Sequence, residues 1–329
     1  MHTPVSLRNL VEESLAHLPY PPQPIGLYEP VRYALTLGGK RLRPVMMLMA
    51  YELWQDHPED ILPQALAMEV YHNFTLLHDD VMDHATVRRG QPCVHVKWGE
   101  NTAILAGDAM LVLAYKLFGC PLIEASDGAQ TDAARSTFDE ATLGVCEGQQ
   151  YDMDFEQATR VSEDDYMEMI RLKTSLLFSC SLKIGAQLAG APADEAQYLY
   201  HFGRLLGLAF QLQDDWLDVY SDPAQFGKQT GGDICENKRT WLLIETLRLA
   251  NDTQREALDK WLKMKDFDRE EKIAAITRLY NELGVGDRCQ QRVNQLFSEA
   301  LEQLEAVALP AERKEPLRQL ALRIMGRQA

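Results

Sequence analysis

In the stretch LAMEVYHNFTLLHDDVMDHATVRRG (residues 66–90), an apolar helical pattern is followed directly by a group of charged residues. Apolar residues recur mostly at spacings of three and four, which is the repeat of an α-helix with a buried face. Three carboxylates, Asp79, Asp80 and Asp83, then end the pattern. Like charges this close repel, and a carboxylate at a helix C-terminus also opposes the helix dipole, at a cost of up to ~1 kcal/mol. A helix that ends in this way needs either a solvated end or a compensating cation.

A second segment, QLQDDWLDV, repeats the arrangement at Asp214, Asp215 and Asp218. Both segments read D-D-x-x-D, and both follow an apolar helical pattern. Because residues four apart share a helix face, the first and last aspartate of each motif present two carboxylates to one point. One such motif is typical of a solvated helix end. Two copies on apolar helices are not, unless cations compensate them.

The compensating cation should be a hard one. Carboxylate oxygens without nearby cysteine or histidine clusters suit Mg²⁺ or Mn²⁺ rather than zinc. An EF-hand is excluded, because these aspartates lie in helices and lack the glycine and the spacing of a calcium loop. Mg²⁺ rarely fills its octahedron with protein ligands and takes phosphate oxygens readily. We therefore expect several Mg²⁺ ions holding a diphosphate between two facing carboxylate pairs.

Positive charge gathers in the same parts of the sequence. The loop GGKRLRP (residues 38–44) carries Lys40, Arg41 and Arg43 behind a Gly-Gly turn, which suits the gripping of a phosphate. It is not a Walker loop, because G-x-x-x-x-G-K-[ST] does not occur. Further basic and polar candidates are Arg88, Arg89, Lys173, Thr174, Lys228, Asp233 and Lys238. A site that binds one diphosphate through metal and a second one without metal would join two phosphorylated substrates or transfer one onto another.

The composition is that of a soluble globular protein. The chain has 329 residues, 46% of them apolar and 25% charged, and its net charge of −16 argues against a nucleic-acid binder. Six cysteines without a CxxC pair predict reduced thiols, and the N-terminus lacks the apolar core of an export signal, so we expect a cytoplasmic location. The most apolar stretch, residues 103–119, is interrupted by Asp108 and Lys116 and predicts a buried helix rather than a membrane span.

The apolar periodicity predicts an all-α protein. Several expected helices are apolar around much of their circumference, as in the interior of a large bundle. The best strand candidate, VHVKW near residue 94, is short. Helices are expected over residues 31–37, 66–83, 163–190 and 195–220, with charged amphipathic helices from 251 onward. No low-complexity linker divides the chain, so we expect one domain over residues 1–329.

In order and spacing these motifs resemble the trans-prenyltransferases, the head-to-tail isoprenyl diphosphate synthases. The resemblance covers about residues 28–245 and rests on GGKRLRP, LLHDDVMDHATVRRG, GQQYDMDFE, LKTS, QLQDDWLDVY and GKQTGGDICENK. It implies a single helical bundle of the isoprenoid synthase type with a central cavity. It also implies a homodimer, for which we expect the helix at residues 103–119 to form the interface. The last hundred residues carry no diagnostic motif.

The resemblance also implies roles for individual residues. About three Mg²⁺ ions, which Mn²⁺ can replace, would be held by Asp79, Asp83, Asp214 and Asp218, with Asp80 and Asp215 in support. The allylic diphosphate would be contacted by Arg88, Lys173, Thr174, Gln211 and Lys228. Isopentenyl diphosphate would be bound by Lys40, Arg43, His72 and Arg89. Lys238 would bind substrate, and Gln149 and Asp233 would complete the inner shell. The expected catalytic set is Asp79, Asp80, Asp83, Lys173, Asp214, Asp215 and Lys228.

One expectation follows from helix geometry alone. His72 precedes Asp79 by seven residues, which places the two within about 20° of each other on an ideal helix. In the implied reaction, the allylic C1–O bond breaks and the double bond of isopentenyl diphosphate attacks the carbocation. A proton is then lost to the departing diphosphate. No protein nucleophile is needed, but water must be excluded.

Product length is expected to depend on the residues just upstream of the first acidic motif. In the resembled family these residues form the floor of the tail cavity, and here they are Tyr71, Phe74 and Thr75. Two bulky rings predict early termination, whereas the small Thr75 and the absence of an insertion in DDVMD favour a C20 over a C15 product. We therefore expect a dimethylallyl, geranyl or farnesyl primer and a geranylgeranyl diphosphate product, with farnesyl diphosphate as the alternative.

Three other classes of protein remain as alternatives. A class I terpene cyclase would normally carry N-D-x-x-S-x-x-x-E where this chain has QDDWLD. A non-catalytic synthase subunit would usually have lost one aspartate motif, and both are intact. A purely structural helical protein would leave six aspartates at helix ends without compensation.

Overall fold

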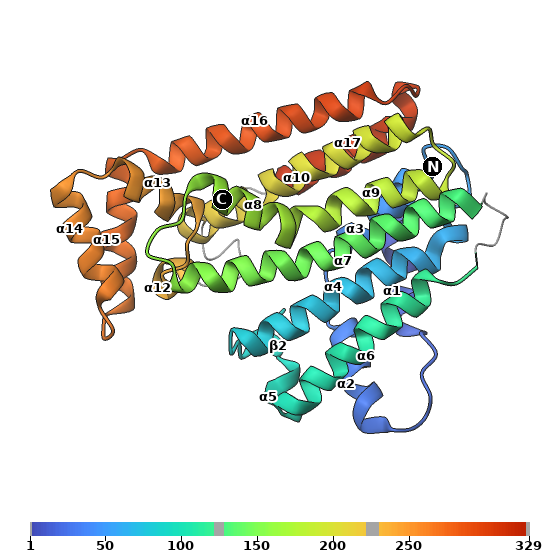
Figure 1. Cartoon of the computed structure of the whole chain (residues 1–329), viewed down its shortest axis with the longest axis horizontal. Coiled ribbons are helices and arrows are strands. Elements are labelled where there is room, and N and C mark those ends of the chain that lie inside the picture. Colours follow the sequence, from blue (N-terminus) through green and yellow to red (C-terminus); the bar gives the residue numbers. More distant parts are fainter. Residues whose placement is uncertain (1, 122–127, 222–229, 327–329) are drawn as a thin grey trace. The chain divides into compact units, whose positions relative to one another are not determined.

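The computed structural model describes residues 2–121, 128–221 and 230–326. These residues are mostly helical, with only two short strands among them, which confirms the all-α prediction (Figure 1). The chain divides into two compact units. Unit 1 comprises Met1–Thr142, Cys180–Leu199 and Val307–Leu317, and unit 2 comprises Leu143–Ser179, Tyr200–Ala306 and Arg318–Ala329. The single domain expected over residues 1–329 stays a prediction.

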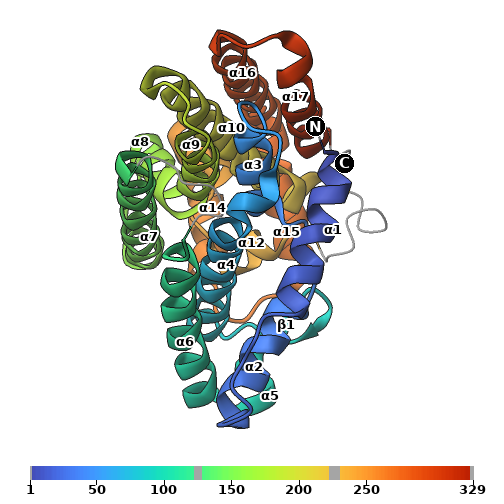
Figure 2. The ribbon, with the colours of Figure 1, turned by 90° about the vertical axis from the view of Figure 1, so that its right-hand side faces the viewer.

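Unit 1 is built around a long buried helix, α4. Its elements are α1 (Pro4–Ala16), α2 (Ile25–Thr36), α3 (Leu42–Tyr51), η1 (Pro58–Ile61), α4 (Leu62–Met82), β1 (Val87–Arg88), β2 (Gln91–Pro92), α5 (Val94–Trp98) and α6 (Glu100–Phe118). The helix α4 packs along α6 and also contacts α2 and α3 (Figure 2). Because neighbours surround it, α4 is apolar around much of its circumference, and its buried side chains include Met68, Val70 and Leu77. This packing fixes the helix that carries the first acidic motif.

A short hairpin follows α4. Strands β1 and β2 pair antiparallel, and their turn consists of Arg89 and Gly90, with φ values of 53° and 76°. Two positive φ values in succession are typical of the tight turns that match strand twist. The segment VHVKW, which was only the best strand candidate of the sequence, forms the helix α5. Its alternating valines have no partner strand among the described residues, so helical hydrogen bonds satisfy the backbone instead.

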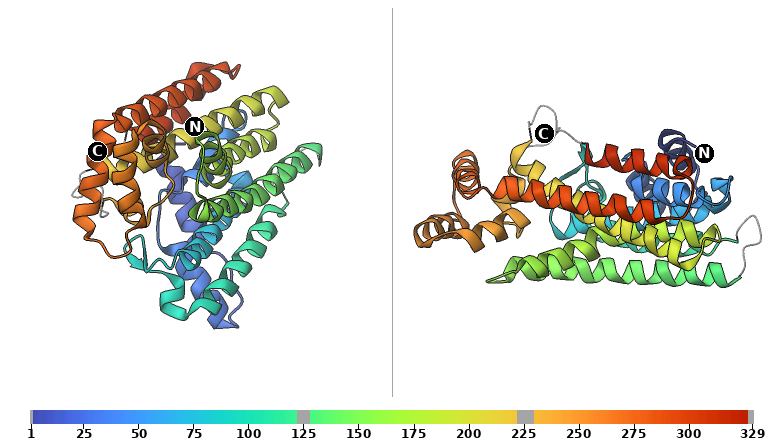
Figure 3. Two further views of the ribbon diagram at one scale, coloured as in Figure 1. Left: turned by 60° about the vertical axis from the view of Figure 1, so that its left-hand side comes forward. Right: turned by 90° about the horizontal axis from the view of Figure 1, so that it is seen from above.

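Unit 2 contains the second acidic motif and most of the C-terminal region. Its elements are α8 (Glu163–Ile170), η2 (Arg171–Ser175), α12 (Gly232–Glu236), α13 (Trp241–Leu249), α14 (Asp252–Lys263), α15 (Arg269–Glu282) and α16 (Val285–Ala306). Four helices run along the chain from one unit into the other: α7 (Gly128–Gln157), α9 (Leu176–Leu188), α10 (Ala193–Tyr220) and α17 (Ala311–Met325). Figure 3 shows α14 and α15 side by side, and both are amphipathic helices, as expected from residue 251 onward.

The helix expected over residues 163–190 is interrupted. A single π-helical turn, η2, separates α8 from α9, and it contains Lys173 and Thr174. Glycines allow neighbouring helices to approach this turn closely. A Cβ added at Gly148 of α7 would lie 2.4 Å from the backbone nitrogen of Lys173, and one at Gly207 of α10 would lie 2.6 Å from Cα of Ser175. Turns of this kind occur frequently at functional sites.

The helix α6 is the one helix of the described residues that is long and apolar enough to cross a membrane. A single such helix is weak support for a span, because core and interface helices pass the same test. It packs against α4 and α2, but Leu105 and Val112 are exposed by 57% and 68%. This exposed apolar face suits the interface that the sequence predicts.

Candidate active site

The first acidic motif ends α4, and its three carboxylates face different surroundings. Asp83 caps the helix and is exposed, and the side chain of Asp79 retains 20% exposure. Asp80 is buried, with 5% exposure, and it accepts hydrogen bonds from Arg88 Nε at 2.7 and 2.8 Å. Nη2 of the same arginine lies 2.6 Å from Asp80 Oδ1. The middle aspartate is therefore anchored to strand β1 and turned away from its two neighbours.

A thiol lies beside this anchored carboxylate. Cys93 is buried, and burial together with the neighbouring charge of Asp80 raises the pKa of the thiol to about 12. A thiol with so high a pKa is a poor nucleophile. Cys93 therefore packs at this site as a buried apolar side chain, which agrees with the expectation that the reaction needs no protein nucleophile.

The second acidic motif, in α10, repeats this division. Asp214 and Asp218 are half-buried, whereas Asp215 is only 4% exposed. Asp215 accepts hydrogen bonds from the hydroxyl of Tyr166, from Gln211 Nε2 at 3.0 Å and from the backbone N–H of Trp241 at 3.4 Å. Burial, and then the charge of Asp233, raises the pKa of the Asp215 carboxyl to about 7. The middle aspartate is again turned inward.

Asp218 is held by the segment that carries Asp233. The backbone N–H of Asp233 donates to Asp218 Oδ2 at 3.1 Å, and the N–H of Gly231 donates to the carbonyl oxygen of Asp218 at 2.6 Å. Burial and the charge of Asp233 raise the pKa of the Asp218 carboxyl to about 6. Two carboxylates held this close repel each other without a cation between them.

The donor set fits a divalent cation of the magnesium type. No group of three or more His, Cys, Asp or Glu side chains forms a closed metal cage within the described residues. Each motif instead offers an outer pair of carboxylates, Asp79 with Asp83 and Asp214 with Asp218. Mg²⁺ is usually bound in this way, by one or two carboxylates together with waters and substrate phosphates. The first motif belongs to unit 1 and the second motif belongs to unit 2.

A small cavity of about 50 Å³ in unit 2 brings several predicted site residues together. Lys173, Thr174, Gln211, Asp215 and Lys238 all line it. The Lys173 ammonium lies 2.6 Å from Asp152 Oδ2, and the Thr174 hydroxyl donates to Gln211 Oε1 at 3.0 Å. Predicted Lys228 lies outside the described residues.

Asp152 is a site residue that sequence reasoning missed. It belongs to the segment GQQYDMDFE on α7, from which only Gln149 was singled out. The two residues are three apart, so they share a helix face, and this spacing was the available signal. Asp152 fixes the ammonium of Lys173 in the π-helical turn.

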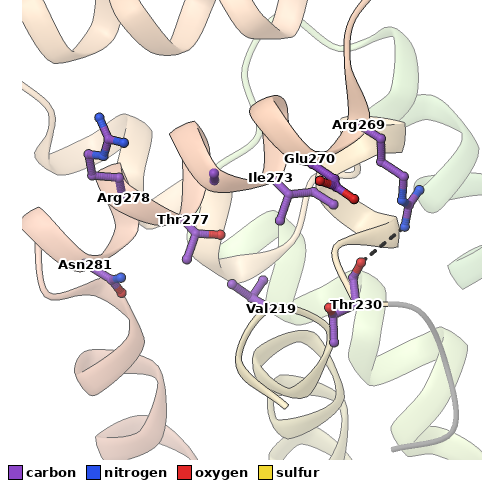
Figure 4. A pocket seen from close by; sticks show the side chains of 9 residues that line it. Val219, Thr230, Arg269, Glu270, Ile273, Thr277, Arg278 and Asn281 are labelled. Carbon is purple, nitrogen blue, oxygen red and sulfur yellow. Dashed lines mark hydrogen bonds between the residues drawn. The ribbon is translucent and has the colours of Figure 1, made fainter. Parts of the chain in front are cut away.

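The α12 segment that carries Asp233 is braced by α15. Arg269 Nη2 donates to the carbonyl oxygen of Thr230 at 3.2 Å, beside a hollow of about 720 Å³ (Figure 4). The fully buried ammonium of Lys272 donates to the carbonyl oxygen of Cys235 at 3.2 Å and to Asn237 Oδ1 at 2.8 Å. These contacts hold both ends of α12, so the C-terminal region supports the second acidic motif.

In unit 1, the basic loop is anchored by an arginine to which no role was assigned. Arg41 is 2% exposed and has a left-handed φ of 50° at the start of α3. Its guanidinium lies 2.7 Å from Glu69 and 3.1 Å from Glu12, and it also donates to the carbonyl oxygen of Leu35 at 2.7 Å. Arg41 therefore fixes the loop, while its neighbour Lys40 is exposed.

The other predicted ligands of the second diphosphate lie close to one another. Nη1 of Arg43 is 2.9 Å from Nε2 of His72, and burial together with the charge of Arg43 holds the pKa of His72 well below its usual value. His72 is therefore a neutral acceptor. Arg89 donates to the carbonyl oxygen of Gly38, and a Cβ added at Gly39 would lie 2.9 Å from the Arg89 guanidinium carbon. The φ of 142° at Gly39, which L side chains rarely adopt, is what favours glycine at this position.

The residues expected to limit product length lie on α4. The Tyr71 hydroxyl donates to the carbonyl oxygen of Thr142 at 2.6 Å, so this fully buried ring is fixed. The ring of Phe74 lies 5.4 Å from that of Tyr71 and 4.8 Å from that of His78. Thr75 donates its hydroxyl to the backbone of its own helix. Their influence on product length stays a prediction.

Comparison with known proteins gives a consistent picture. Residues 25–280 match the family model described as polyprenyl synthetase. A geranylgeranyl diphosphate synthase of Methanosarcina mazei is 37% identical over 289 residues, which cover 87% of this chain and 85% of the relative. One from Sulfolobus acidocaldarius is 39% identical over 252 residues, covering 76% of this chain and 75% of the relative.

Solved structures agree with the curated relatives. A crystal structure of a geranylgeranyl pyrophosphate synthase superposes with a TM-score of 0.92 at 41% identity and covers 100% of both chains. The corresponding synthetase from Pyrococcus horikoshii gives a TM-score of 0.91 at 30% identity, with 99% of this chain and 98% of that chain covered. A Caulobacter crescentus polyprenyl synthase, at 27% identity with a TM-score of 0.83, was solved with calcium and isoprenyl diphosphate; 99% of this chain and 95% of that chain are covered.

Proposed function

The chain belongs to the polyprenyl synthetase family and is a prenyltransferase, and from this premise we propose that it is a geranylgeranyl diphosphate synthase. It condenses isopentenyl diphosphate with an allylic diphosphate to a C20 product. The relatives named as geranylgeranyl diphosphate synthases support this product. A Mycobacterium bovis relative named as a farnesyl diphosphate synthase, 34% identical over 88% of this chain and 80% of its own length, keeps the C15 product as the alternative.

The observation that carries the proposal is the same in both acidic motifs. The middle carboxylate is buried and hydrogen-bonded by protein groups, and the two outer carboxylates stay accessible. Arg88 satisfies Asp80, and Tyr166 with Gln211 satisfies Asp215. Each motif thus presents two outer carboxylates that could bind a hard cation, the number that Mg²⁺ takes from protein when phosphate supplies the rest.

In the proposed mechanism Asp79, Asp83, Asp214 and Asp218 hold Mg²⁺. When bound, Mg²⁺ withdraws charge from the allylic diphosphate. Lys173, Thr174, Gln211, Lys228 and Lys238 orient the same diphosphate, so that negative charge developing on the leaving group meets fixed donors. Arg88 donates its Nε and Nη2 hydrogens to Asp80. Its role is therefore to fix the conformation of the first acidic motif and to place a positive charge beside Asp79.

The basic loop holds the second substrate. Lys40, Arg43, His72 and Arg89 bind the diphosphate of isopentenyl diphosphate, and Arg41 keeps the loop in place. Neutral His72 accepts a hydrogen bond from Arg43 and so directs that guanidinium. The buried apolar surroundings of α4 exclude water from the reacting carbons. Phe74 and Tyr71 limit the growth of the tail.

The proposal extends to the assembly and to the location of the protein. The exposed apolar face of α6, which includes Leu105 and Val112, forms a homodimer interface. The protein works in the cytoplasm with its cysteines reduced. All six cysteines lie in described segments and none is in a disulfide.

A condensation assay tests the proposed function. Purified protein is incubated with Mg²⁺, isopentenyl diphosphate and one of three primers, namely dimethylallyl, geranyl or farnesyl diphosphate, and the products are sized by chromatography after dephosphorylation. We expect C20 products and no turnover after chelation of the metal. A C15 end product would replace the geranylgeranyl assignment by the farnesyl one. Absence of condensation with all three primers would refute the proposal.

A further inference from the structure

A buried tyrosine outside both acidic motifs contacts the second one. Tyr166 lies on α8, is 2% exposed and donates its hydroxyl to Oδ2 of Asp215, a residue 49 positions further along the chain. Burial, and then the charge of Asp215, raises the pKa of the Tyr166 hydroxyl well above its usual value, so the hydroxyl keeps its proton and remains a donor. Neither the motifs nor the proposed mechanism gives this residue a role.

The hydrogen bonds around Asp215 form a connected network. Asp215 Oδ1 accepts from Gln211 Nε2 at 3.0 Å, and Gln211 Oε1 accepts from the Thr174 hydroxyl at 3.0 Å. The backbone N–H of Trp241 donates to Asp215 Oδ2 at 3.4 Å. Tyr166, Thr174, Gln211 and Asp215 all line the same small cavity of unit 2. The network thus joins α8, the π-helical turn, α10 and the start of α13.

This network fixes the orientation of a side chain that is expected to contact substrate. Asp215 Oδ1 accepts a hydrogen bond from the amide nitrogen of Gln211, and this contact holds the nitrogen toward the carboxyl group. The amide oxygen of Gln211 is then directed to Thr174, and the second N–H of its nitrogen is available to a phosphate oxygen. If Asp215 rotated, the amide of Gln211 would lose the contact that selects this orientation.

We infer that Tyr166 is a positioning residue of the allylic diphosphate site, acting through Asp215. Its hydroxyl holds the middle carboxylate of the second motif in place. Asp215 in turn directs the amide of Gln211 toward the diphosphate and remains turned away from the metal ligands. This inference rests on the proposed function, because it concerns the same diphosphate. It assigns Tyr166 no direct contact with substrate.

The substitution Tyr166→Phe removes only the hydroxyl. We expect the affinity for inorganic diphosphate with Mn²⁺, measured by titration calorimetry, to fall about tenfold, equivalent to about 1.4 kcal/mol. The KM for the allylic substrate should rise by a similar factor, and the KM for isopentenyl diphosphate should stay within about twofold, since its expected ligands lie in unit 1. Tyr115→Phe is the matched control, because Tyr115 is a partly buried tyrosine whose hydroxyl pairs with Thr142 in unit 1.

A double-mutant cycle tests whether Tyr166 acts through Asp215. In the background Asp215→Asn, Tyr166→Phe should change diphosphate affinity by less than about twofold, because the acceptor that it orients has already been altered. Tyr166→Phe alone leaves the buried Asp215 carboxylate without the hydroxyl that donates to it and could therefore prevent folding. The double variant has no carboxylate at position 215, so it can still be compared with Asp215→Asn.

Two sets of results would overturn the inference. The first is that Tyr166→Phe binds diphosphate as tightly as wild type, or that Tyr115→Phe loses as much diphosphate affinity as Tyr166→Phe. The other is an equal loss in both Asp215 backgrounds, which would mean that Tyr166 acts independently of Asp215. A wild-type protein that binds diphosphate but condenses no substrate would refute the proposed function instead, so the two failures are distinguishable.

Discussion

Replacing Asp80 by asparagine should destabilise the protein, whereas the same change three residues later should not. Asp80 is 5% exposed and pairs with Arg88 through contacts of 2.6, 2.7 and 2.8 Å. Removing one partner of a buried ion pair costs about 3–5 kcal/mol. The Arg88 side chain retains 28% exposure and can recover hydration, so we expect about 2–3 kcal/mol. At about 2 °C per kcal/mol for a chain of this size, the melting temperature should fall by 4–6 °C.

Asp83→Asn is the matched control. Asp83 is exposed and caps the C-terminus of α4, where a negative charge opposes the helix dipole. Without metal, its removal should leave the melting temperature unchanged or raise it by about 1 °C. The proposed function predicts the reverse order for ligand binding, because Asp83 holds metal and Asp80 does not.

Thermal unfolding with and without Mg²⁺ and inorganic diphosphate measures both effects. At about 100 times the dissociation constant, a ligand stabilises by about 2.7 kcal/mol. Wild type and Asp80→Asn should therefore melt about 5 °C higher with ligand, and Asp83→Asn should not. The reasoning is refuted if Asp83→Asn loses as much stability as Asp80→Asn in the metal-free protein, or if it keeps the full ligand shift.

Three further variants test other parts of the account. Phe74→Ala should lengthen the main product by about one isoprene unit, because the removed ring vacates space beside Tyr71; an unchanged product profile would exclude Phe74 as the plug. Gly148→Ala should raise the KM for the allylic substrate at least tenfold, because the added Cβ would lie 2.4 Å from the backbone nitrogen of Lys173 and would displace this residue. An unchanged KM would contradict this prediction. In the metal-free protein, the pKa of the Asp215 carboxyl is raised to about 7, whereas in the unfolded chain this carboxyl loses its proton near pH 4. The folded protein therefore binds an extra proton between these pH values, so the free energy of unfolding should fall as the pH rises from 4 to 7. Asp215→Asn should flatten this part of the profile, and an equally steep profile would argue against the raised pKa.

The helices and the positions of the acidic motifs followed from local pattern. A period of 3.6 identified α4 and α10, and the spacing of the aspartates placed each outer pair on one face. The closeness of Arg43 to His72 also agrees with the expected grouping around the second diphosphate. The helices and the aspartate faces depend on residues within a few turns of one helix, so one sequence contains enough information. The grouping of Arg43 with His72, which lie on different helices, came instead from the family resemblance.

Features that depend on distant partners could not be predicted. The inward turn of Asp215 is set by Tyr166, 49 residues away, and the burial of Arg41 is set by Glu69 and Glu12 from other helices. The π-helical turn at Lys173 packs closely against Gly148 and Gly207, which lie on other helices and are distant in the sequence. The segment VHVKW has an alternating pattern but forms a helix, and no strand in the described part of the chain pairs with it.

The central claim is that the outer carboxylates of both motifs hold divalent metal around one allylic diphosphate. A crystal grown with Mn²⁺ and a non-ionisable allylic diphosphate analogue, with anomalous scattering recorded at the manganese edge, tests it most directly. We predict metal peaks at coordination distance from Asp79 and Asp83 and from Asp214 and Asp218, with Asp80 and Asp215 still bound by Arg88 and Tyr166. Metal coordinated by Asp80 or Asp215, or analogue bound without any metal peak, would contradict the account.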